Sequence, residues 1–180
     1  MARRLPRRPS RPSRHRGFRY TVDASVFVNA FNPHEEGHAE SLAILTAIQQ
    51  TSDPIIVPTL LLPEIASAVA RASDDTSGAL QYAGATAALP HLTVVSLTAV
   101  IARQAAELAA THRLRGADAV YVAVARRYGT TLVSRDEEQR SRAAALVPCQ
   151  TPEDALRSRQ TPKRTKPSRK PLPRIGERPP

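Results

Sequence analysis

The stretch LRGADAVYVAVARRYGTTLVSRDEE, residues 114–138, places two aspartates beside segments that have the composition of buried elements. Asp118 opens an apolar run that predicts a helix ending at Gly129. Residues 130–134 are typical of a β-strand, and Asp136 follows them directly. Charged residues are almost never fully buried without a partner. These two positions therefore bear on both the fold and the function.

The rest of the chain alternates short apolar runs with longer helical patterns. Strands are expected at residues 18–22, 55–58, 92–97 and 130–134, with 145–149 as a candidate fifth strand. Helices are expected at residues 25–31, 35–50, 60–72, 77–89, 99–113 and 118–129, and another helix after residue 134. The strands are continuously apolar, which is typical of a parallel sheet covered on both faces. The sequence predicts a three-layer α/β/α sandwich with a short parallel sheet of about four to five strands.

Charge divides the chain into three parts. Residues 1–19 carry eight Arg and no acid, and residues 157–180 carry nine Lys or Arg and one Glu. The middle therefore holds nine of the 26 basic residues and 15 of the 16 acidic residues, a net charge of −6. We expect a folded domain at 19–156 between disordered, Pro-rich basic segments at 1–18 and 157–180. Their charge suits RNA or DNA, although a solubilising role is equally compatible with it.

Several classes of protein are excluded or disfavoured by what the chain lacks. The single cysteine, Cys149, allows no intramolecular disulfide. No apolar stretch reaches transmembrane length and no secretory signal pattern is present, so the expectation is a cytoplasmic protein with no membrane association. The predicted domain has no lysine and no G-x-x-x-x-G-K, G-x-G-x-x-G or G-x-S-x-G motif. Nucleotide-cradling and serine-hydrolase sites are therefore not expected.

Four acids stand beside apolar segments: Asp23, Glu64, Asp118 and Asp136. Each can be explained singly as a helix cap or a first-turn charge, and residues 134–137 match a capping box. In a parallel α/β sheet, however, ligands bind outside the carboxyl ends of the strands, where such positions meet. Clustered carboxylates repel each other, and a hard divalent cation such as Mg²⁺ or Mn²⁺ relieves that repulsion.

The stretch HEEGH, residues 34–38, matches the zinc motif H-E-x-x-H. It follows Asn32 and Pro33 at a helix start, contains Gly37, and has no evident third ligand downstream. We interpret it as the exposed start of a helix rather than as a zinc site.

Four motifs in order resemble the PIN domain, in particular the toxin ribonucleases of VapBC toxin–antitoxin pairs. They are VDASVFVNAF (22–31), VPTLLLPEIASAVAR (57–71), LRGADAVYVAVARRYG (114–129) and TTLVSRDEE (130–138). The resemblance covers residues 19–156. The fourth motif has Ser-Arg-Asp where the family more commonly has Thr-x-Asp, and the basic ends are not part of the family domain.

The resemblance implies a divalent-metal-dependent endoribonuclease. Asp23, Glu64, Asp118 and Asp136 would be its catalytic residues and would hold one or two Mg²⁺ or Mn²⁺ ions. Asp23 and Asp118 would be direct metal ligands. A water activated by the metal would attack the RNA phosphorus in line.

The resemblance also implies further residues and partners. Ser134 would hydrogen-bond and orient a carboxylate. Apart from the resemblance, Arg115 and Arg135 neighbour two of the acids in the sequence and could meet RNA phosphates, or they are ordinary surface arginines. The implied partners are an RNA substrate, a cognate VapB-like antitoxin and a second copy of the chain in a homodimer. Two alternatives remain: a PIN-domain nuclease of RNA processing without an antitoxin, and a non-catalytic protein that binds nucleic acid through its basic ends.

Overall fold

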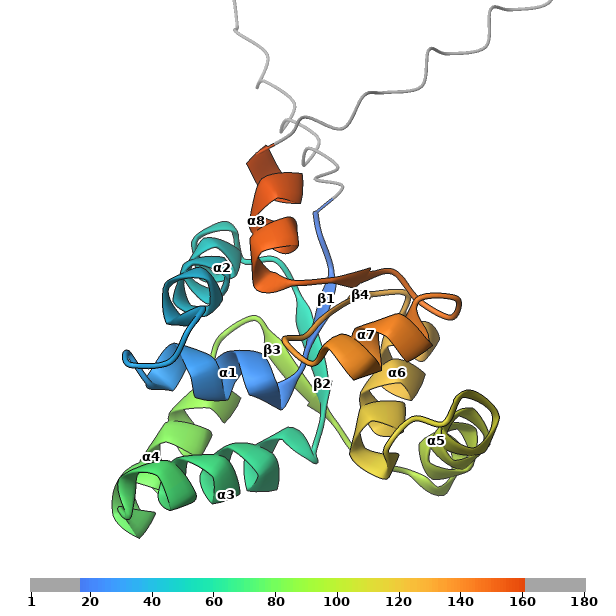
Figure 1. Ribbon diagram of the computed structural model, residues 1–180, viewed down its shortest axis with the longest axis horizontal. Coiled ribbons are helices and arrows are strands. Elements are labelled where there is room, and N and C mark those ends of the chain that lie inside the picture. The colour runs from blue at the N-terminus through green and yellow to red at the C-terminus, as the bar shows by residue number, and fades with distance from the viewer. Residues whose placement is uncertain (1–16, 161–180) are drawn as a thin grey trace, which may run out of the picture.

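In the computed structural model, which describes residues 17–160, strands and helices alternate along the chain (Figure 1). The elements are β1 (Tyr20–Val22), α1 (Ala24–Phe31), α2 (His38–Thr51), β2 (Ile55–Pro58), α3 (Leu61–Ser73), α4 (Thr76–Ala87), β3 (Leu92–Val95), α5 (Ala99–His112), α6 (Gly116–Tyr128), β4 (Thr131–Val133), α7 (Glu137–Ala143), β5 (Cys149–Gln150) and α8 (Pro152–Gln160). All the strand pairs are parallel, in the order β3-β2-β1-β4-β5. The predicted α/β class and parallel sheet are confirmed.

The strand order decides which face each helix covers. Crossovers between parallel strands are right-handed, so a run of strands laid down in one direction places its helices on one face. The chain runs from β1 through β2 to β3 in one direction and then returns across the sheet to β4 and β5. Helices α1 to α4 accordingly lie on one side of the sheet in Figure 1, and α5 and α6 lie on the other.

The reversal of direction creates a topological switch point at the centre of the sheet. β1 pairs with β2 on one edge and with β4 on the other, and the connections that leave β1 and β4 diverge to opposite faces. A crevice forms between such diverging connections at the carboxyl ends of the two strands. Asp23 follows β1 directly, and Asp136 comes three residues after β4.

The buried position of helix α6 explains the long apolar run at residues 119–125. Seven successive residues, 119–125, are buried, because the helix packs against β1, β2 and β4 on one side and α5 on the other. A helix that is apolar all round is stable only inside a protein. Gly129 ends it in the left-handed conformation, with φ of 62°, which glycine adopts without steric cost.

Several predicted boundaries differ from the structure by one to three residues, and two differences are larger. The fifth strand is Cys149–Gln150 rather than 145–149, because residues 144–146 form a turn after α7. The expected domain boundary at 156 falls inside α8, which continues to Gln160. The predicted disordered ends lie almost wholly outside the described residues and stay predictions.

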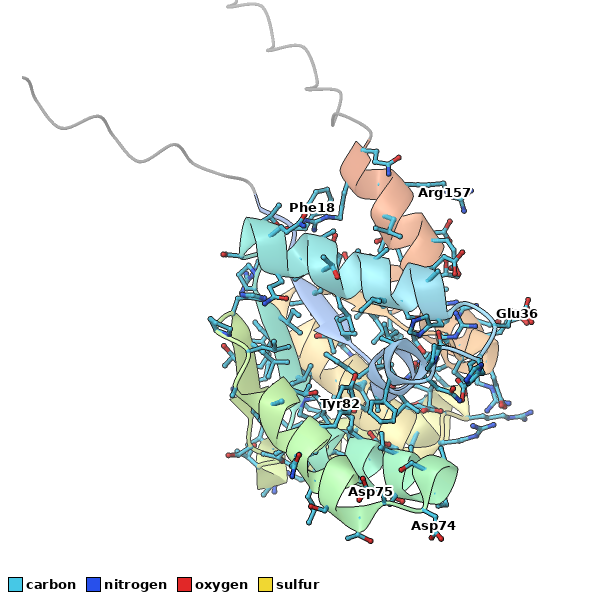
Figure 2. The ribbon with its side chains drawn as sticks, turned by 90° about the vertical axis from the view of Figure 1, so that its left-hand side faces the viewer. Phe18, Glu36, Asp74, Asp75, Tyr82 and Arg157 are labelled. Carbon is cyan, nitrogen blue, oxygen red and sulfur yellow. The ribbon has the colours of Figure 1, made fainter. Side chains whose placement is uncertain are left out.

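Arg159 ties the end of α8 to the rest of the domain. Its guanidinium forms an ion pair with Asp53 at 2.7 Å, and both side chains are about 90% buried (10% and 9% exposed). The same group donates to the Ala47 carbonyl oxygen at 3.0 Å and lies over the ring of Phe18, 5.2 Å from its centroid. Figure 2 shows Phe18 at the end of the molecule where α8 lies. α8 is therefore part of the folded domain.

We predict that Arg159→Met destabilises the protein by about 3 kcal/mol, because it leaves the Asp53 carboxylate buried without its counter-charge. Arg157→Met in the same helix is the matched control. Arg157 pairs with Asp154 on the exposed surface, so its loss should change the unfolding free energy by less than about 1 kcal/mol. Urea unfolding of the two variants measures the difference. Equal stabilities would show that α8 is not anchored through Arg159.

Candidate functional site

Asp23 is a buried carboxylate at the end of the central strand. Its Oδ2 accepts a hydrogen bond from the Ser25 backbone N–H at 2.9 Å, so it caps α1. Its Oδ1 accepts a second bond from the Gln139 amide at 3.1 Å. The residue is 8% exposed. Burial raises the pKa of Asp23, and the bonds from Ser25 and Gln139 oppose that rise.

Asp118 lies in the first turn of α6, two residues inside the helix. The N-cap position is Arg115, so the interpretation of Asp118 as an N-cap is wrong. Desolvation and the neighbouring carboxylates of Asp23 and Asp136 raise the pKa of Asp118 to about 6, against the opposing effect of Arg115. Repulsion from the Asp23 and Asp136 carboxylates therefore disfavours the charged form of Asp118.

Glu64 lies in the first turn of α3, as one of the two local interpretations of this acid predicted. Its Oε2 accepts a hydrogen bond from the Tyr121 hydroxyl at 2.7 Å. Burial raises the pKa of Glu64, the Tyr121 hydrogen bond lowers it, and the charges of Asp23 and Asp118 raise it further. Tyr121 is fully buried in α6, so the sheet-covering helix fixes the orientation of this acid.

Asp136 is the N-cap of α7, and its Oδ1 accepts from the Gln139 backbone N–H at 2.9 Å. The N-cap is therefore Asp136 rather than Ser134, and the reciprocal bonds of the capping box predicted for residues 134–137 do not form. The Ser134 hydroxyl oxygen accepts from the Asp136 backbone N–H at 3.0 Å. Ser134, which is fully buried, positions Asp136 through its main chain rather than through its carboxylate.

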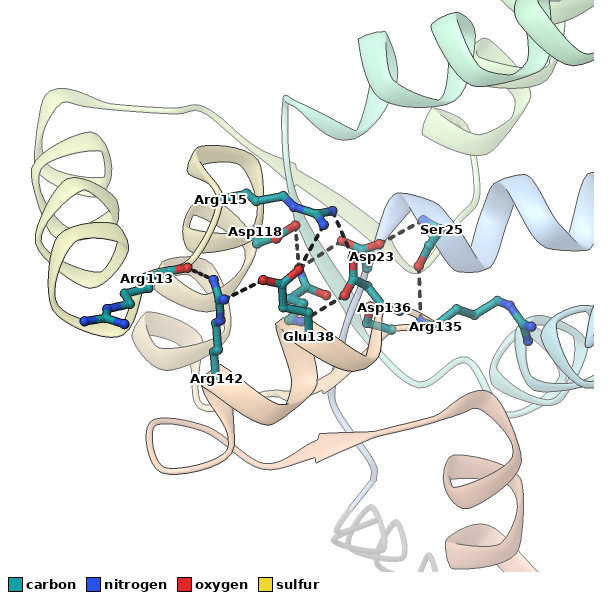
Figure 3. Close-up of polar contacts among 11 residues, drawn as sticks. Asp23, Ser25, Arg113, Arg115, Asp118, Arg135, Asp136, Glu138 and Arg142 are labelled. Carbon is teal, nitrogen blue, oxygen red and sulfur yellow. Dashed lines mark hydrogen bonds and ion pairs between the residues drawn. The ribbon is translucent and has the colours of Figure 1, made fainter.

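Three of the four predicted acids line one open pocket of about 550 Å³: Asp23, Glu64 and Asp118. Asp136 does not line it, but its Oδ1 accepts from the backbone N–H of Gln139, whose side-chain amide donates to Asp23. Figure 3 shows the carboxylates of Asp23, Asp118 and Asp136 close together near the guanidinium of Arg115. Elements distant in the sequence thus bring all four acids to the switch point of the sheet.

The two arginines predicted to meet RNA are engaged with the protein itself. Arg115 pairs with Asp136 at 3.3 Å and with Glu138 at 2.9 Å. Arg135 donates to the Glu36 carbonyl oxygen at 2.8 Å and lies 3.9 Å from the Glu153 carboxylate. Both side chains therefore already have partners within the protein at the edge of the site.

Sequence reasoning missed a different arginine, Arg71, which lines the same pocket as the acids. It stands seven residues after Glu64 on α3, so the two side chains lie on one face of the helix, about 10 Å apart along its axis. Within residues 17–160 it donates to the Ser67 hydroxyl and forms no ion pair with a carboxylate. The pocket therefore has an acidic end and a separate basic end.

The carboxylate oxygens of the pocket are suitable ligands for a hard cation that binds few protein groups. Within residues 17–160, no three Asp, Glu, His or Cys side chains already stand in a metal-ligating group. Mg²⁺ is commonly held by one or two carboxylates, with waters and substrate phosphates completing its shell. Within the same residues, Oδ2 of Asp118 and Oε1 of Glu64 accept no hydrogen bond. Both oxygens of Asp23, in contrast, already accept one hydrogen bond each, so Asp23 could ligate a cation only through a remaining lone pair.

The HEEGH stretch does not have the geometry of a zinc motif. α2 begins at His38, and Gly37 before it is in the left-handed conformation, with φ of 78°. His34 lies outside the helix, so the two histidines do not share a helical face. The Glu35 carboxylate accepts hydrogen bonds from the Asn29 and Asn32 side chains and helps to hold this turn.

The comparison with protein families agrees with this arrangement. The family model described as the PIN domain matches residues 20–145 of the 180-residue chain. The chain belongs to the PIN domain family. The match spans the strand and helix starts that carry all four acids.

Solved structures share the fold of this PIN domain. VapBC2 from Rickettsia felis, bound to a promoter DNA fragment, is similar with a TM-score of 0.58 at 16% identity over 74% of this chain and 98% of that one. Mycobacterium tuberculosis VapC20, a sarcin–ricin loop cleaving toxin, has a TM-score of 0.58 at 20% identity over 70% and 94%. FitAcB from Neisseria gonorrhoeae has a TM-score of 0.55 at 20% identity over 74% and 98%. No curated protein matches the sequence.

None of the helices between residues 17 and 160 of this PIN domain is both long enough and apolar enough to cross a membrane.

The raised pKa of Asp118 predicts a pH-dependent cost to the metal-free PIN domain. The folded pKa of about 6 lies above the ordinary value of 3.8, so the folded protein binds this proton more tightly than the unfolded chain. Destabilisation from the charged form is present above pH 6 and is lost as the pH falls toward 4. With EDTA at pH 7.5, Asp118→Asn should unfold with a free energy higher by about 1 kcal/mol, after allowance for solvent screening.

Urea titrations at pH 7.5 and at pH 4.5 measure this difference, most of which should be lost at the lower pH. Asp75→Asn is the control, because Asp75 caps α4 at the exposed turn seen in Figure 2 and Asn caps nearly as well. An Asp118→Asn difference that does not change with pH would contradict the electrostatic account.

Proposed function

We propose that this PIN domain is a divalent-metal-dependent endoribonuclease and the toxin of a toxin–antitoxin pair. The observation that carries the proposal is the convergence of Asp23, Glu64 and Asp118 on one pocket at the switch point of the sheet. Family membership supports nuclease activity. The fold shared with VapC20 and VapBC2 supports the more specific class.

The residues divide the work of phosphodiester hydrolysis. Asp23 and Asp118 would hold Mg²⁺ or Mn²⁺, which when bound lowers the pKa of water and neutralises charge on a phosphate. Glu64, fixed through one oxygen by Tyr121, has its other oxygen available to orient the attacking water and accept its proton. Asp136 keeps the start of α7 in place and adds negative charge beside the ligands.

The partners follow from the same comparison. VapBC2 carries the name of the toxin–antitoxin pairs that the sequence resembles, which supports a VapB-like antitoxin for this chain. A homodimer and a cytoplasmic site of action belong to the proposal through the family resemblance. A role in RNA processing without an antitoxin uses the same site, so the two functions differ in partner rather than in chemistry.

The metal and the ribonuclease activity are tested together by Asp23→Asn and Asp118→Asn. Each change removes a charged ligand while keeping the size of the side chain. We expect cleavage of a labelled RNA to fall by on the order of 100-fold or more. The rise in melting temperature on adding Mn²⁺ should shrink in both variants, because the metal then binds the folded state less tightly.

Asp75→Asn again provides the matched control and should cut RNA normally. A wild-type protein that cuts DNA but not RNA would contradict the ribonuclease, and near-normal cleavage by Asp118→Asn would contradict the site.

Arg71 should bind the RNA backbone at the basic end of the pocket. In a protein that also carries Asp118→Asn, so that the RNA stays intact, Arg71→Ala should weaken RNA binding about tenfold. It should also reduce the slope of log affinity against log salt by about 1, because one phosphate contact is lost. Filter binding at several salt concentrations measures both quantities.

Arg103→Ala is the control for Arg71. Arg103 is an exposed arginine on α5 and does not line the pocket, so its loss should change the affinity and the slope much less. Equal effects of the two variants would show that Arg71 has no specific place on the RNA path.

A further inference from the structure

Gln139 joins the two carboxylates that we assign to the metal. It is fully buried at the third position of α7. Its Nε2 donates to Oδ1 of Asp23 at 3.1 Å and lies 3.5 Å from Oδ1 of Asp118. These aspartates come from the end of β1 and from the start of α6, so one neutral side chain links two segments about 95 residues apart in the sequence.

The local structure explains why Gln139 is free for this contact. A Gln at the third helical position after an Asp N-cap would normally reach back to the backbone N–H of the cap residue. In this chain the Asp136 N–H donates instead to the Ser134 hydroxyl oxygen at 3.0 Å. The Gln139 side chain is therefore not needed at the cap and turns toward the pocket.

The oxygen of the Gln139 amide, Oε1, indicates that the side chain is placed for function rather than for stability. Within residues 17–160, the buried Gln139 Oε1 has no hydrogen-bond partner. A buried polar atom without a partner costs stability, and native proteins keep few of them. Turning the amide over would place its oxygen against two carboxylates, which is worse. The protein thus leaves one acceptor unpaired while both aspartates receive a donor.

The chemistry of an amide suits a metal centre that must stay negative. Asp23 and Asp118 repel each other, and a buried Lys or Arg between them would hold them together but would also cancel the charge that attracts a cation. An amide donates hydrogen bonds without adding charge. A carboxylate oxygen has a second lone pair, so it can accept from Gln139 and still ligate a metal.

We propose that Gln139 is the positioning residue of this metal centre: it holds Asp23 and Asp118 at the separation from which both ligate one divalent cation. The inference rests on the proposed function, because it takes these two aspartates as the ligands. Groups that orient metal ligands through hydrogen bonds typically change metal affinity by 10- to 100-fold when they are removed.

The test is Mn²⁺ affinity, measured by the EPR signal of free Mn²⁺, with Gln139→Met and Gln139→Leu. Both changes remove the N–H donors and also remove the unpaired oxygen, so the metal-free melting temperature should stay near that of the wild type. The Mn²⁺ dissociation constant should rise 10- to 100-fold. Because Gln139 touches no substrate in this account, RNA cleavage should recover to within about fivefold when Mn²⁺ is raised to saturation. Gln81→Met, at an exposed position on α4, should change none of these.

The outcomes separate this inference from the proposed function. A folded Gln139 variant with wild-type Mn²⁺ affinity overturns the positioning role while leaving the nuclease intact. Cleavage that stays low at saturating Mn²⁺ also overturns it, because Gln139 would then act on the reaction itself. If the wild type binds Mn²⁺ in a way that Asp118→Asn abolishes, yet cuts no RNA, the proposed activity fails, and a 10- to 100-fold weaker Mn²⁺ affinity of the Gln139 variants would still support the positioning role.

Discussion

Repulsion between buried and half-buried carboxylates at the end of the central strand is the constraint on which the site depends. Asp23, Glu64 and Asp118 line one pocket, and burial together with the charge of neighbouring carboxylates raises the pKa of each. A parallel sheet whose strand order reverses beside β1 brings their helices to the same edge. The fold holds these acids together although they destabilise it, which is typical of sites where function competes with stability.

The hydrogen bonds that hold the acids in place also build the helices around them. Asp23 caps α1, and Asp136 caps α7. Capping and metal binding are therefore not alternatives, because each carboxylate has two oxygens. In Asp23 one oxygen accepts from the helix backbone and the other from the Gln139 amide. The helix starts thus orient the ligands, which is the precision that a catalytic site requires.

Features set by local patterns could be predicted from the sequence, and those set by distant contacts could not. Strand β2 is found at the predicted residues 55–58 because it is an uninterrupted apolar run. The roles of Tyr121 and Gln139 depend on partners 57 and 116 residues away. Gln139 carried a weak signal, since it stands three residues after Asp136, but that spacing suggests a capping box.

Helix α8 was missed for a different reason. Its start has the sequence signs of a helix N-terminus: Thr151 accepts from the Asp154 N–H, and Pro152 takes the first helical position. The basic composition that begins at residue 157 obscured them. Only the structure shows that Arg159, counted from sequence as part of a disordered segment, is a buried partner of Asp53. The average composition of a segment cannot identify a single residue, such as Arg159, that is buried against the domain.

The central claim is that Asp23 and Asp118 ligate the same divalent cation. The most direct measurement is a crystal structure of the wild-type protein soaked in Mn²⁺, with anomalous diffraction used to locate the metal. The account predicts an anomalous peak between the two side chains, within about 2.2 Å of an oxygen of each. A peak at another site, such as His34 and His38, or no peak in the pocket at millimolar Mn²⁺, would contradict it.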